Sequence, residues 1–462
     1  MTQTTNRPRP TATESARAGT TPAPQDAVGQ AVGRARAAAP GWRRTAPAER
    51  AGLLREAASE VRRCADELGD LLCGTTNRLL AESRESARVA ADLLDEAAVT
   101  GLAGGRALAG GPGALDVVRP VPRGVVGVIT PWNDPYPAAA GLLAAALVTG
   151  NAVVHKPSER SAAPGRRLTE VIAAGLPEGV LELVEGDAVA GAALAAHPGV
   201  DLVAHIGSSA AGASVRVACA ARGAAAITEN GGKDALLVDA DVDPSWAAEQ
   251  IAVGAFANAG QLCTSVERVY VHADVADAVL TELVRRAEAL VVGDPRDPDS
   301  TMAALVDERA LQTVDAHVQE AVRAGARLLT GGRRLAGAPT AYAPTVLTDV
   351  TDDMTVMAEE TFGPVAAVSV VGSWQEGLER AAAGRYGLAA TVLTDDAAHA
   401  LEAIDTLEVG TVKVNAVFGG APGGSADPRR DSGQGAGYGP DLLREMVVLK
   451  AVHWEPAPRR QD

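Results

Sequence analysis

The sequence predicts an α/β protein with parallel β-sheets covered by helices. Between residues 125 and 221, short apolar segments typical of buried strands alternate with helical segments, and a second alternating set begins at residue 235. Strands that alternate with helices form right-handed βαβ units and hence a parallel sheet. A chain of 462 residues is also too long for one simple core, so we expect at least two substructures, with a boundary near residues 230–235.

The region before the first strand is predicted to be mostly helical. Apolar residues recur with the spacing of one helix face over Ala48–Cys73, which places Cys64 on the packed face. A second helix is expected over Leu79–Leu102, and a glycine-rich connection follows over residues 104–113.

The two alternating sets give the remaining elements. In the first set, strands are predicted over residues 125–129, 152–155, 180–184 and 202–206, with helices over 137–148, 165–174, 188–196 and 209–221. In the second set, strands are predicted over 235–239 and 269–272, with helices over 246–257 and 275–291.

Composition excludes several classes of partner and compartment. The net charge of −16 argues against a nucleic-acid or anionic-membrane surface, and no apolar run is long enough to span a bilayer. The four cysteines form no CxxC pair and the seven histidines are scattered, so we expect no metal site and a reducing, cytoplasmic location. Residues 1–24 are acid-poor and rich in Thr, Pro, Ala and Arg. We expect a disordered tail there, with a transit peptide as the alternative.

Chemically useful residues follow the predicted strands, where parallel sheets bind ligands. Asn133 is either a turn residue or half of an oxyanion hole, and Glu229 is either a surface carboxylate or a general base. Lys156-Pro-Ser-Glu159 is either a solvated turn or a clamp for a ribose. Gly207-x-x-x-x-Gly212 lies at the start of a predicted helix. It is either a tight turn from strand to helix or a cradle for a phosphate.

Cys263 lies in a loop that begins at Gly260 and leads into a strand. A free cysteine in this position is either a buried packing residue or a nucleophile.

Taken together, these segments resemble the aldehyde dehydrogenase superfamily in order and separation, from about residue 30 to 453. The matching segments are Pro131-Trp132-Asn133, Gly150-Asn151, Lys156-Pro157-Ser158-Glu159, Gly207-Ser208, Glu229-x-Gly231-Gly232-Lys233, Gly260-Gln261-x-Cys263, Glu359-Glu360-Thr361-Phe362-Gly363-Pro364-Val365 and Gly410-Thr411-Val412-x-Val414-Asn415.

The resemblance implies oxidation of a small-molecule aldehyde to a carboxylic acid. Cys263 is then the nucleophile, and the Asn133 amide and the Cys263 N–H hold the oxyanion. Glu229 is the base that activates water for thioester hydrolysis, and members that transfer the acyl group to coenzyme A usually lack this carboxylate.

The resemblance also implies NAD as cofactor, with NADP as the alternative. The implied cofactor residues are Trp132, Lys156, Ser158, Glu159, Gly207, Ser208, Gly212, Glu360 and Phe362. Lys156 and Glu159 would hold the adenosine ribose, and the Glu159 carboxylate would repel a 2′-phosphate, which favours NAD. Without the resemblance, the sequence predicts that Phe362 is a core residue.

The implied fold is a Rossmann-like cofactor domain with an α/β catalytic domain and a small β oligomerisation element. The cofactor domain would comprise residues 25–112 and 124–231, and the catalytic domain residues 232–436. The oligomerisation element would combine residues 113–123 with 437–462. Strands at Leu115–Arg123 and Met446–Trp454 are expected to pair across a subunit interface, in a homodimer or homotetramer.

Several residues bear on the substrate. Asp134 is either a helix N-cap followed by Pro135 or an attractor for an amino-aldehyde. In the loop 425–431, Arg429 and Arg430 are either exposed or partners of a semialdehyde carboxylate. The resemblance puts Ala138, Ala139 and Gly141 on the helix that lines the substrate tunnel, which is then wide.

Two further questions stay open from the sequence. His155 and His205 end two strands and are expected to be hydrogen-bonded core residues, as neighbours across the sheet. The alternatives to a hydrolytic NAD enzyme are a coenzyme A-acylating or NADP-preferring relative, and a non-catalytic scaffold. A scaffold does not require Asn133, Glu229 and Cys263 together.

Overall fold

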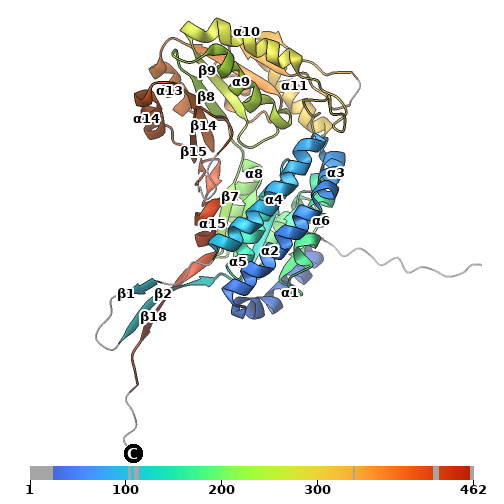
Figure 1. Ribbon diagram of the computed structural model, residues 1–462, viewed down its shortest axis with the longest axis vertical. Coiled ribbons are helices and arrows are strands. Elements are labelled where there is room, and N and C mark those ends of the chain that lie inside the picture. The colour runs from blue at the N-terminus through green and yellow to red at the C-terminus, as the bar shows by residue number, and fades with distance from the viewer. Residues whose placement is uncertain (1–23, 102–105, 109–113, 337–338, 420–425, 458–462) are drawn as a thin grey trace, which may run out of the picture.

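The computed structural model of the chain describes residues 24–101, 106–108, 114–336, 339–419 and 426–457. Figure 1 shows two α/β lobes and a narrow β arm that projects from one of them. The expected disordered tail lies outside the described residues, except that Pro24 already begins helix α1 (Pro24–Arg44), which the sequence analysis did not predict.

The first lobe is built on a six-stranded sheet with the order β17-β7-β6-β3-β4-β5. Its five main strands are parallel: β3 (Val125–Thr130), β4 (Ala152–Pro157), β5 (Leu181–Leu183), β6 (Leu202–Ile206) and β7 (Ala225–Glu229). The short strand β17 (Gly433–Gln434) returns from late in the chain and pairs antiparallel with β7.

Helices cover both faces of this sheet because alternate strand residues point into two separate cores. Val126 and Val128 pack in one core, while Val125 packs in the other. The first core holds α2 (Pro47–Arg63), α3 (Ala65–Thr76), α4 (Leu80–Thr100), α5 (Pro135–Val148) and α6 (Ala162–Ala173). The second core holds α1, α7 (Ala188–Ala196) and α8 (Ser209–Ala220).

The predicted single helix over Ala48–Cys73 is two helices in the structure. The chain leaves helical geometry at Cys64 (φ −90°, ψ 6°), which ends α2 and precedes α3. The break lets α2 and α3 both pack against the one long helix α4, and Cys64 stays buried as expected.

The second lobe is built on a seven-stranded sheet with the order β10-β11-β12-β9-β8-β14-β15. The strands are β8 (Asp234–Val238), β9 (Val266–His272), β10 (Arg327–Thr330), β11 (Thr345–Thr348), β12 (Val365–Val371), β14 (Ala389–Leu393) and β15 (Thr411–Val414). Only β10 runs antiparallel to its neighbour.

The helices of the second lobe connect these strands. They are α9 (Pro244–Phe256), α10 (Ala273–Ala289), α11 (Glu308–Arg323), α12 (Thr355–Ala358), α13 (Trp374–Ala382) and α14 (Ala397–Thr406). Short elements complete the chain: the 3-10 turns η1 (Glu159–Ser161) and η2 (Ala257–Gly260), the pair β13 (Tyr386–Gly387) with β16 (Arg429–Arg430), and helix α15 (Gly439–Glu445).

The arm contains β1 (Arg106–Leu108), β2 (Leu115–Pro122) and β18 (Val447–Trp454). Strands β2 and β18 pair antiparallel along their whole length within one chain, from Pro122 opposite Val447 to Leu115 opposite Trp454. The two stretches thus combine into one element as expected, and the pairing of this element across a subunit interface stays a prediction. The hairpin-like arm forms locally because both strands leave the same lobe side by side (Figure 1).

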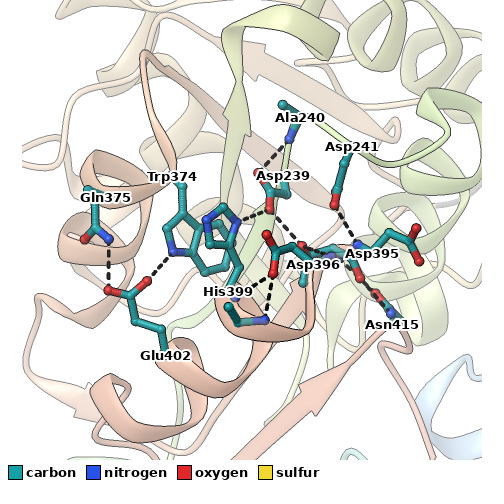
Figure 2. A network of polar contacts seen from close by, with 12 residues as sticks. Asp239, Ala240, Asp241, Trp374, Gln375, Asp395, Asp396, His399, Glu402 and Asn415 are labelled. Carbon is teal, nitrogen blue, oxygen red and sulfur yellow. Dashed lines mark hydrogen bonds and ion pairs between the residues drawn. The ribbon is translucent and has the colours of Figure 1, made fainter.

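A polar network anchors α13 and α14 to the end of β8, as Figure 2 shows. Asp239 Oδ2 accepts hydrogen bonds from Thr394 Oγ1 (2.7 Å) and contacts His399 Nδ1 (2.6 Å), and the His399 ring stacks on Trp374 with 4.3 Å between centroids. The Trp374 Nε1–H donates to Glu402 (2.8 Å). The hydrogen bond to Asp239 raises the pKa of His399 and so favours the protonated imidazolium. The contact between the helices and the sheet is therefore strongest while His399 is protonated, and it weakens as the pH rises through the pKa of His399.

No helix in the described ranges is both long enough and apolar enough to cross a membrane.

Candidate active site

One cavity of about 1040 Å³ lies at the carboxyl edge of the six-stranded sheet, where the second lobe faces it. All but one of the predicted site residues line it: Trp132, Asn133, Lys156, Ser158, Glu159, Gly207, Ser208, Glu229, Cys263, Glu360 and Phe362. The two lobes contribute opposite strand ends. Asn133 and Glu229 lie at the carboxyl ends of β3 and β7, whereas Cys263 and Glu360 precede β9 and β12.

A left-handed turn delivers Cys263 into this cavity. Asn258 (φ 46°), Ala259 (φ 55°) and Gly260 (φ 70°) are three successive residues in the left-handed region, which is strained for the two that carry a side chain. Gly260 has a second constraint, because a Cβ there would overlap the Gly363 carbonyl oxygen. The turn redirects the chain after α9 so that the thiol faces the first lobe.

Side-chain amides hold this turn and connect it to the other lobe. Asn133 Nδ2 donates to the Gln261 carbonyl oxygen (3.0 Å), and Asn258 Nδ2 donates to the carbonyl oxygens of Gln261 (3.3 Å) and Asn133 (3.4 Å). Gln261 Nε2 donates to the Asn258 carbonyl (3.1 Å), and Gln261 Oε1 accepts from Val306 N–H (2.9 Å). Buried polar groups that bond one another in this way fix one geometry.

The same contacts leave two donors near the thiol. The Asn133 amide nitrogen carries two N–H bonds, and among the described residues only one of them is used, by Gln261. The backbone N–H of Cys263 makes no backbone hydrogen bond within the described chain. This pair matches the donors that a developing oxyanion requires.

The surroundings of the thiol are largely withdrawn from solvent and acidic. Burial raises the pKa of Cys263 well above its ordinary value, and the nearby carboxylates of Glu229, Asp234, Glu360 and Asp134 raise it further. The thiol therefore stays protonated at rest, and a base must remove its proton before it can attack.

Glu229 lines the same cavity as Cys263, and its acidity is also shifted. Withdrawal of its carboxylate from water raises the pKa of Glu229 to about 7. The carboxylate lies against the loop that precedes α15, where a Cβ on Gly437 would overlap Glu229 Oε2. Only glycine at position 437 leaves room for this carboxylate orientation.

The Lys156–Glu159 segment forms an ion pair at the cavity wall. Lys156 Nζ lies 3.5 Å from Glu159 Oε2, with the lysine buried and the carboxylate half exposed. Ser158 accepts a hydrogen bond from Arg160 N–H (3.3 Å), and Ser208 caps α8 by accepting from Ala211 N–H (3.4 Å). These contacts fix the two turns that border the strand ends.

Gly212 is the predicted cofactor residue that does not line the cavity. A Cβ at Gly212 would overlap the Asn230 side chain, so the position requires glycine for close packing of α8 and not for approach of a phosphate. The expected phosphate cradle is thus limited to Gly207, Ser208 and the first turn of α8.

A buried ion pair positions the segment that carries Glu360. Glu267 accepts hydrogen bonds from Lys233 Nζ (2.5 Å), Thr361 N–H (2.7 Å) and Phe362 N–H (2.9 Å). Phe362 is itself left-handed (φ 54°) and is held in this conformation by these bonds. Burial raises the pKa of Glu360 to about 8, and the Gly232 N–H donates to its carboxylate (3.2 Å).

Aromatic contacts cover this side of the cavity. The rings of Trp132 and Phe362 meet edge to face with 5.7 Å between centroids, and the Arg160 guanidinium lies 5.5 Å from the Trp132 ring. Phe362 therefore lines the cavity in contact with Trp132 and is not simply a core residue.

The two histidines at strand ends differ from the prediction. β3 lies between β4 and β6, and His155 and His205 are opposite successive β3 residues, so they are not neighbours and point to opposite faces. His155 is hydrogen-bonded as expected, to Thr130 (2.9 Å) and Thr169 (2.7 Å). His205 was predicted to be hydrogen-bonded, but among the described residues neither ring nitrogen has a hydrogen-bond partner, and the residue lines the cavity.

Two residues that were expected to bear on the substrate, Asp134 and Arg430, have protein partners in the structure. Asp134 does precede α5 with Pro135 as its first residue, but its carboxylate makes no cap and instead binds Arg78 (2.7 Å) and Ser86 (2.6 Å). Arg430 is bound by Glu408 and by the carbonyl oxygens of Ala382 and Gly384.

Of the arginines and tunnel residues proposed for substrate binding, only two line the cavity. Neither Arg429 nor Arg430 does, so the semialdehyde role of these arginines is not supported. Ala138 and Gly141 line it, whereas Ala139 is in the core.

Sequence reasoning missed the residues that support the site. Asn258 was not selected, although Asn tolerates the left-handed region and precedes Ala-Gly in the sequence. Glu267 was not selected from the loop that holds Cys263, and nothing in its local pattern indicates the buried pair with Lys233.

The donor set fits a dinucleotide. A buried lysine, a half-exposed carboxylate and the first turn of α8 converge on the cavity, and the unpaired His205 nitrogens are further donors or acceptors without a protein partner. Within the described residues, no group of three or more His, Cys, Asp or Glu side chains is arranged to hold a metal ion.

Comparison with known proteins agrees with the geometry. The family model described as "Aldehyde dehydrogenase family" matches residues 2–452. The chain is 38% identical to an α-ketoglutarate semialdehyde dehydrogenase from Haloferax volcanii over 87% of both proteins. It superposes on an NAD-dependent aldehyde dehydrogenase from Sinorhizobium meliloti with a TM-score of 0.91 and 34% identity, covering 94% of this chain and 88% of the other.

A further structural relative is betaine aldehyde dehydrogenase from Staphylococcus aureus in complex with NAD+, with a TM-score of 0.91, 26% identity and coverage of 94% and 89%. The fold and cavity define a two-lobed α/β oxidoreductase, and the chain belongs to the aldehyde dehydrogenase family. The predicted class of reaction, the oxidation of an aldehyde to an acid with NAD, is confirmed at the level of the family.

The contact of Gly437 with Glu229 gives a direct test of carboxylate placement. We expect Gly437→Ala to displace the Glu229 side chain and to lower kcat for aldehyde-dependent NADH formation by about tenfold or more, because a general base must lie within hydrogen-bond reach. Gly175→Ala is the matched control, since Gly175 is exposed and a Cβ there meets nothing within 4 Å. An unchanged kcat in Gly437→Ala would contradict the assigned geometry.

Proposed function

We propose that this chain oxidises its aldehyde through a covalent thioester on Cys263 that water hydrolyses with Glu229 as base. The observation that carries the proposal is the convergence of one thiol, one carboxylate with a pKa near 7 and two amide donors on a single cavity. A scaffold on the same fold does not require this combination.

The first step is attack of the Cys263 thiolate on the aldehyde carbon. Glu229 takes the thiol proton, and the Asn133 amide and the Cys263 N–H donate to the oxygen that becomes negative. Losing one such donor typically costs about 3–4 kcal/mol of transition-state stabilisation. Bound NAD supplies the acceptor for the hydride that leaves the tetrahedral carbon, and a thioester remains on Cys263.

Before the second step Glu229 passes the thiol proton to solvent. The ionised carboxylate then removes a proton from water, which attacks the thioester carbonyl, and this proton goes to the departing Cys263 thiolate. The same two donors hold the oxyanion again, and the thiol is released with the acid. Because the base must be ionised, turnover is expected to rise with pH through about 7, the pKa of Glu229.

Lys156, Glu159, Ser158, Gly207, Ser208 and Trp132 are proposed to hold the adenosine and phosphate part of the cofactor, and Glu360 and Phe362 the nicotinamide end. Support comes from their common cavity and from the Glu267 contacts that fix the 360–362 segment. The half-exposed Glu159 carboxylate favours NAD over NADP, because it would repel a 2′-phosphate.

We propose a division into a cofactor domain (25–112 and 124–231), a catalytic domain (232–436) and an oligomerisation element (113–123 and 437–462). The six-stranded sheet lies within the first, apart from β17, and the seven-stranded sheet lies within the second. A cytoplasmic location is likewise proposed, on the absence of cysteine pairing.

The test of the mechanism compares Cys263→Ala and Glu229→Gln. We expect Cys263→Ala to form no NADH with any aldehyde. Glu229→Gln is expected to accumulate an acyl adduct on Cys263, because hydrolysis lacks its base, and intact-protein mass spectrometry after mixing with aldehyde and NAD measures it. Release of the adduct by added coenzyme A in the wild type, in preference to water, would support the acylating alternative instead.

The arm is proposed to join subunits into a homodimer or homotetramer. Leu108, Leu115, Val448, Leu449 and Trp454 expose large apolar side chains on it, which a partner would cover. We expect light scattering to give a dimer or tetramer mass for the wild type and a smaller species for Leu449→Glu with Trp454→Glu. A monomeric wild type at micromolar concentration would refute the assembly.

A further inference from the structure

The cavity has two arms, one on each face of the six-stranded sheet. The first runs over the strand ends and along α7 and α8, past Lys156 and Ser208. The second lies between α4, α5 and α15, on the opposite face. Cys263 and Asn133 lie where the arms meet. If the first arm takes the cofactor, the second is left for the rest of the aldehyde.

Small and apolar side chains line the second arm. They occupy one face of each helix: Leu93, Ala97 and Thr100 on α4, Pro137, Ala138, Gly141 and Ala145 on α5, and Leu442 and Leu443 on α15. A Cβ on Gly141 would meet no atom within 4 Å, so the space beside this helix is open. The lining residues of α5 run from Pro137 to Ala145, and these eight steps along the helix cover about 12 Å.

The charge of this arm is negative or zero. Glu96 and Asp134 line it, whereas the basic residues among the described lining are Lys156, Arg160 and Arg309, on the cofactor side. Arg78 lies near Asp134 but is already bound by Asp134 and by the Asn133 carbonyl (3.2 Å). A substrate carboxylate in this arm would lose its hydration without gaining a cation.

We propose that the substrate is a bulky apolar aldehyde without a carboxylate, with an aryl or long alkyl group that fills the arm between α4 and α5. The inference rests on the proposed function, because it requires Cys263 as nucleophile. It differs from the anionic substrate in the name of the Haloferax relative. Packing of apolar surface against Leu93, Ala97 and Leu443 would provide the binding energy.

The experiment measures kcat/KM for 2-naphthaldehyde, decanal, propanal and succinic semialdehyde. We expect the two bulky aldehydes to exceed succinic semialdehyde by about tenfold or more. Gly141→Phe is expected to lower kcat/KM for the bulky aldehydes by about tenfold and to leave propanal almost unchanged, because the ring occupies the open space. Gly175→Phe, at an exposed position, is the control.

The outcomes separate the two proposals. Preference for succinic semialdehyde, or equal loss on all aldehydes in Gly141→Phe, would overturn the substrate inference and leave the thioester mechanism intact. No NADH from any aldehyde would overturn the proposed function itself.

A second observation, independent of the first, concerns His205 at the end of β6. Its side chain is 5% exposed and lines the cofactor arm, and neither Nδ1 nor Nε2 has a hydrogen-bond partner in the described structure. The ring lies against Gly207, where a Cβ would be 2.7 Å from His205 Cε1. A buried imidazole without partners destabilises the fold, so its presence in a cofactor arm points to a ligand.

The surroundings of the ring are those of a phosphate site. Burial lowers the pKa of His205, the nearby Ser208 backbone opposes this without meeting hydrogen-bond geometry, and Lys156 lowers the pKa further. The Ser208 side chain caps α8 beside the ring. Burial lowers this pKa to about 4, so near pH 7 the neutral ring offers one N–H donor. We infer that His205 positions the cofactor by donating this N–H to a phosphate oxygen held at the start of α8. This inference also rests on the proposed function.

The test uses calorimetric binding and thermal unfolding, without turnover. We expect His205→Phe to raise the Tm of the cofactor-free protein, because an apolar ring removes two unpaired polar atoms, and to weaken NADH and ADP-ribose binding by about tenfold. Adenosine binding should not change. His205→Gln, which keeps an N–H donor, should recover part of the NADH affinity.

Unchanged NADH affinity in His205→Phe would overturn the inference. It would indicate that water, and not a phosphate of the cofactor, is the hydrogen-bond partner of the His205 ring. Equal weakening of NADH and adenosine would also overturn it, since the phosphate would then not be the partner. If the wild-type enzyme forms no NADH in a Cys263-dependent reaction, the proposed function is refuted instead. The binding measurements do not depend on turnover, so the two failures can be told apart.

Discussion

The structure depends on the hydrogen-bonded amides of Asn133, Asn258 and Gln261. They stabilise a left-handed turn in which Asn258 and Ala259 would otherwise be strained, and they join the two lobes beside Cys263. The thiol comes from the lobe of the seven-stranded sheet, while the amide donor comes from the lobe of the six-stranded sheet. The distance between them is therefore fixed by these bonds and not by either sheet alone.

The second constraint is the removal of charge from water around the thiol. Burial raises the pKa values of Glu229 and Glu360 to about 7 and 8, and it keeps Cys263 protonated at rest. A protonated thiol and a carboxylate of nearly neutral pKa therefore line the same cavity. The buried ion pair of Lys233 with Glu267 holds the segment of Glu360.

Glycines make the contacts that larger residues would prevent. Gly437 leaves room for the Glu229 carboxylate, and Gly260 permits the approach of the Gly363 carbonyl. Gly212 and Gly141 differ in their surroundings. The Asn230 side chain occupies the space where a Cβ of residue 212 would lie, whereas the space beside Gly141 is open. The number of glycines in the sequence did not distinguish these roles, because a glycine has no side chain from which its neighbours can be inferred.

The sequence by itself determined the alternation of strands and helices, the motifs that identify the family, and the strand ends that carry Asn133, Lys156 and Glu229. These features follow from local periodicity and from the chain direction in parallel sheets. The tertiary structure alone decided that Arg430 is bound away from the cavity, that Asp134 binds Arg78, and that the His205 ring has no hydrogen-bond partner within the described part of the chain. Such contacts join residues far apart in the chain, and no local pattern of apolar and polar residues encodes which side chains meet.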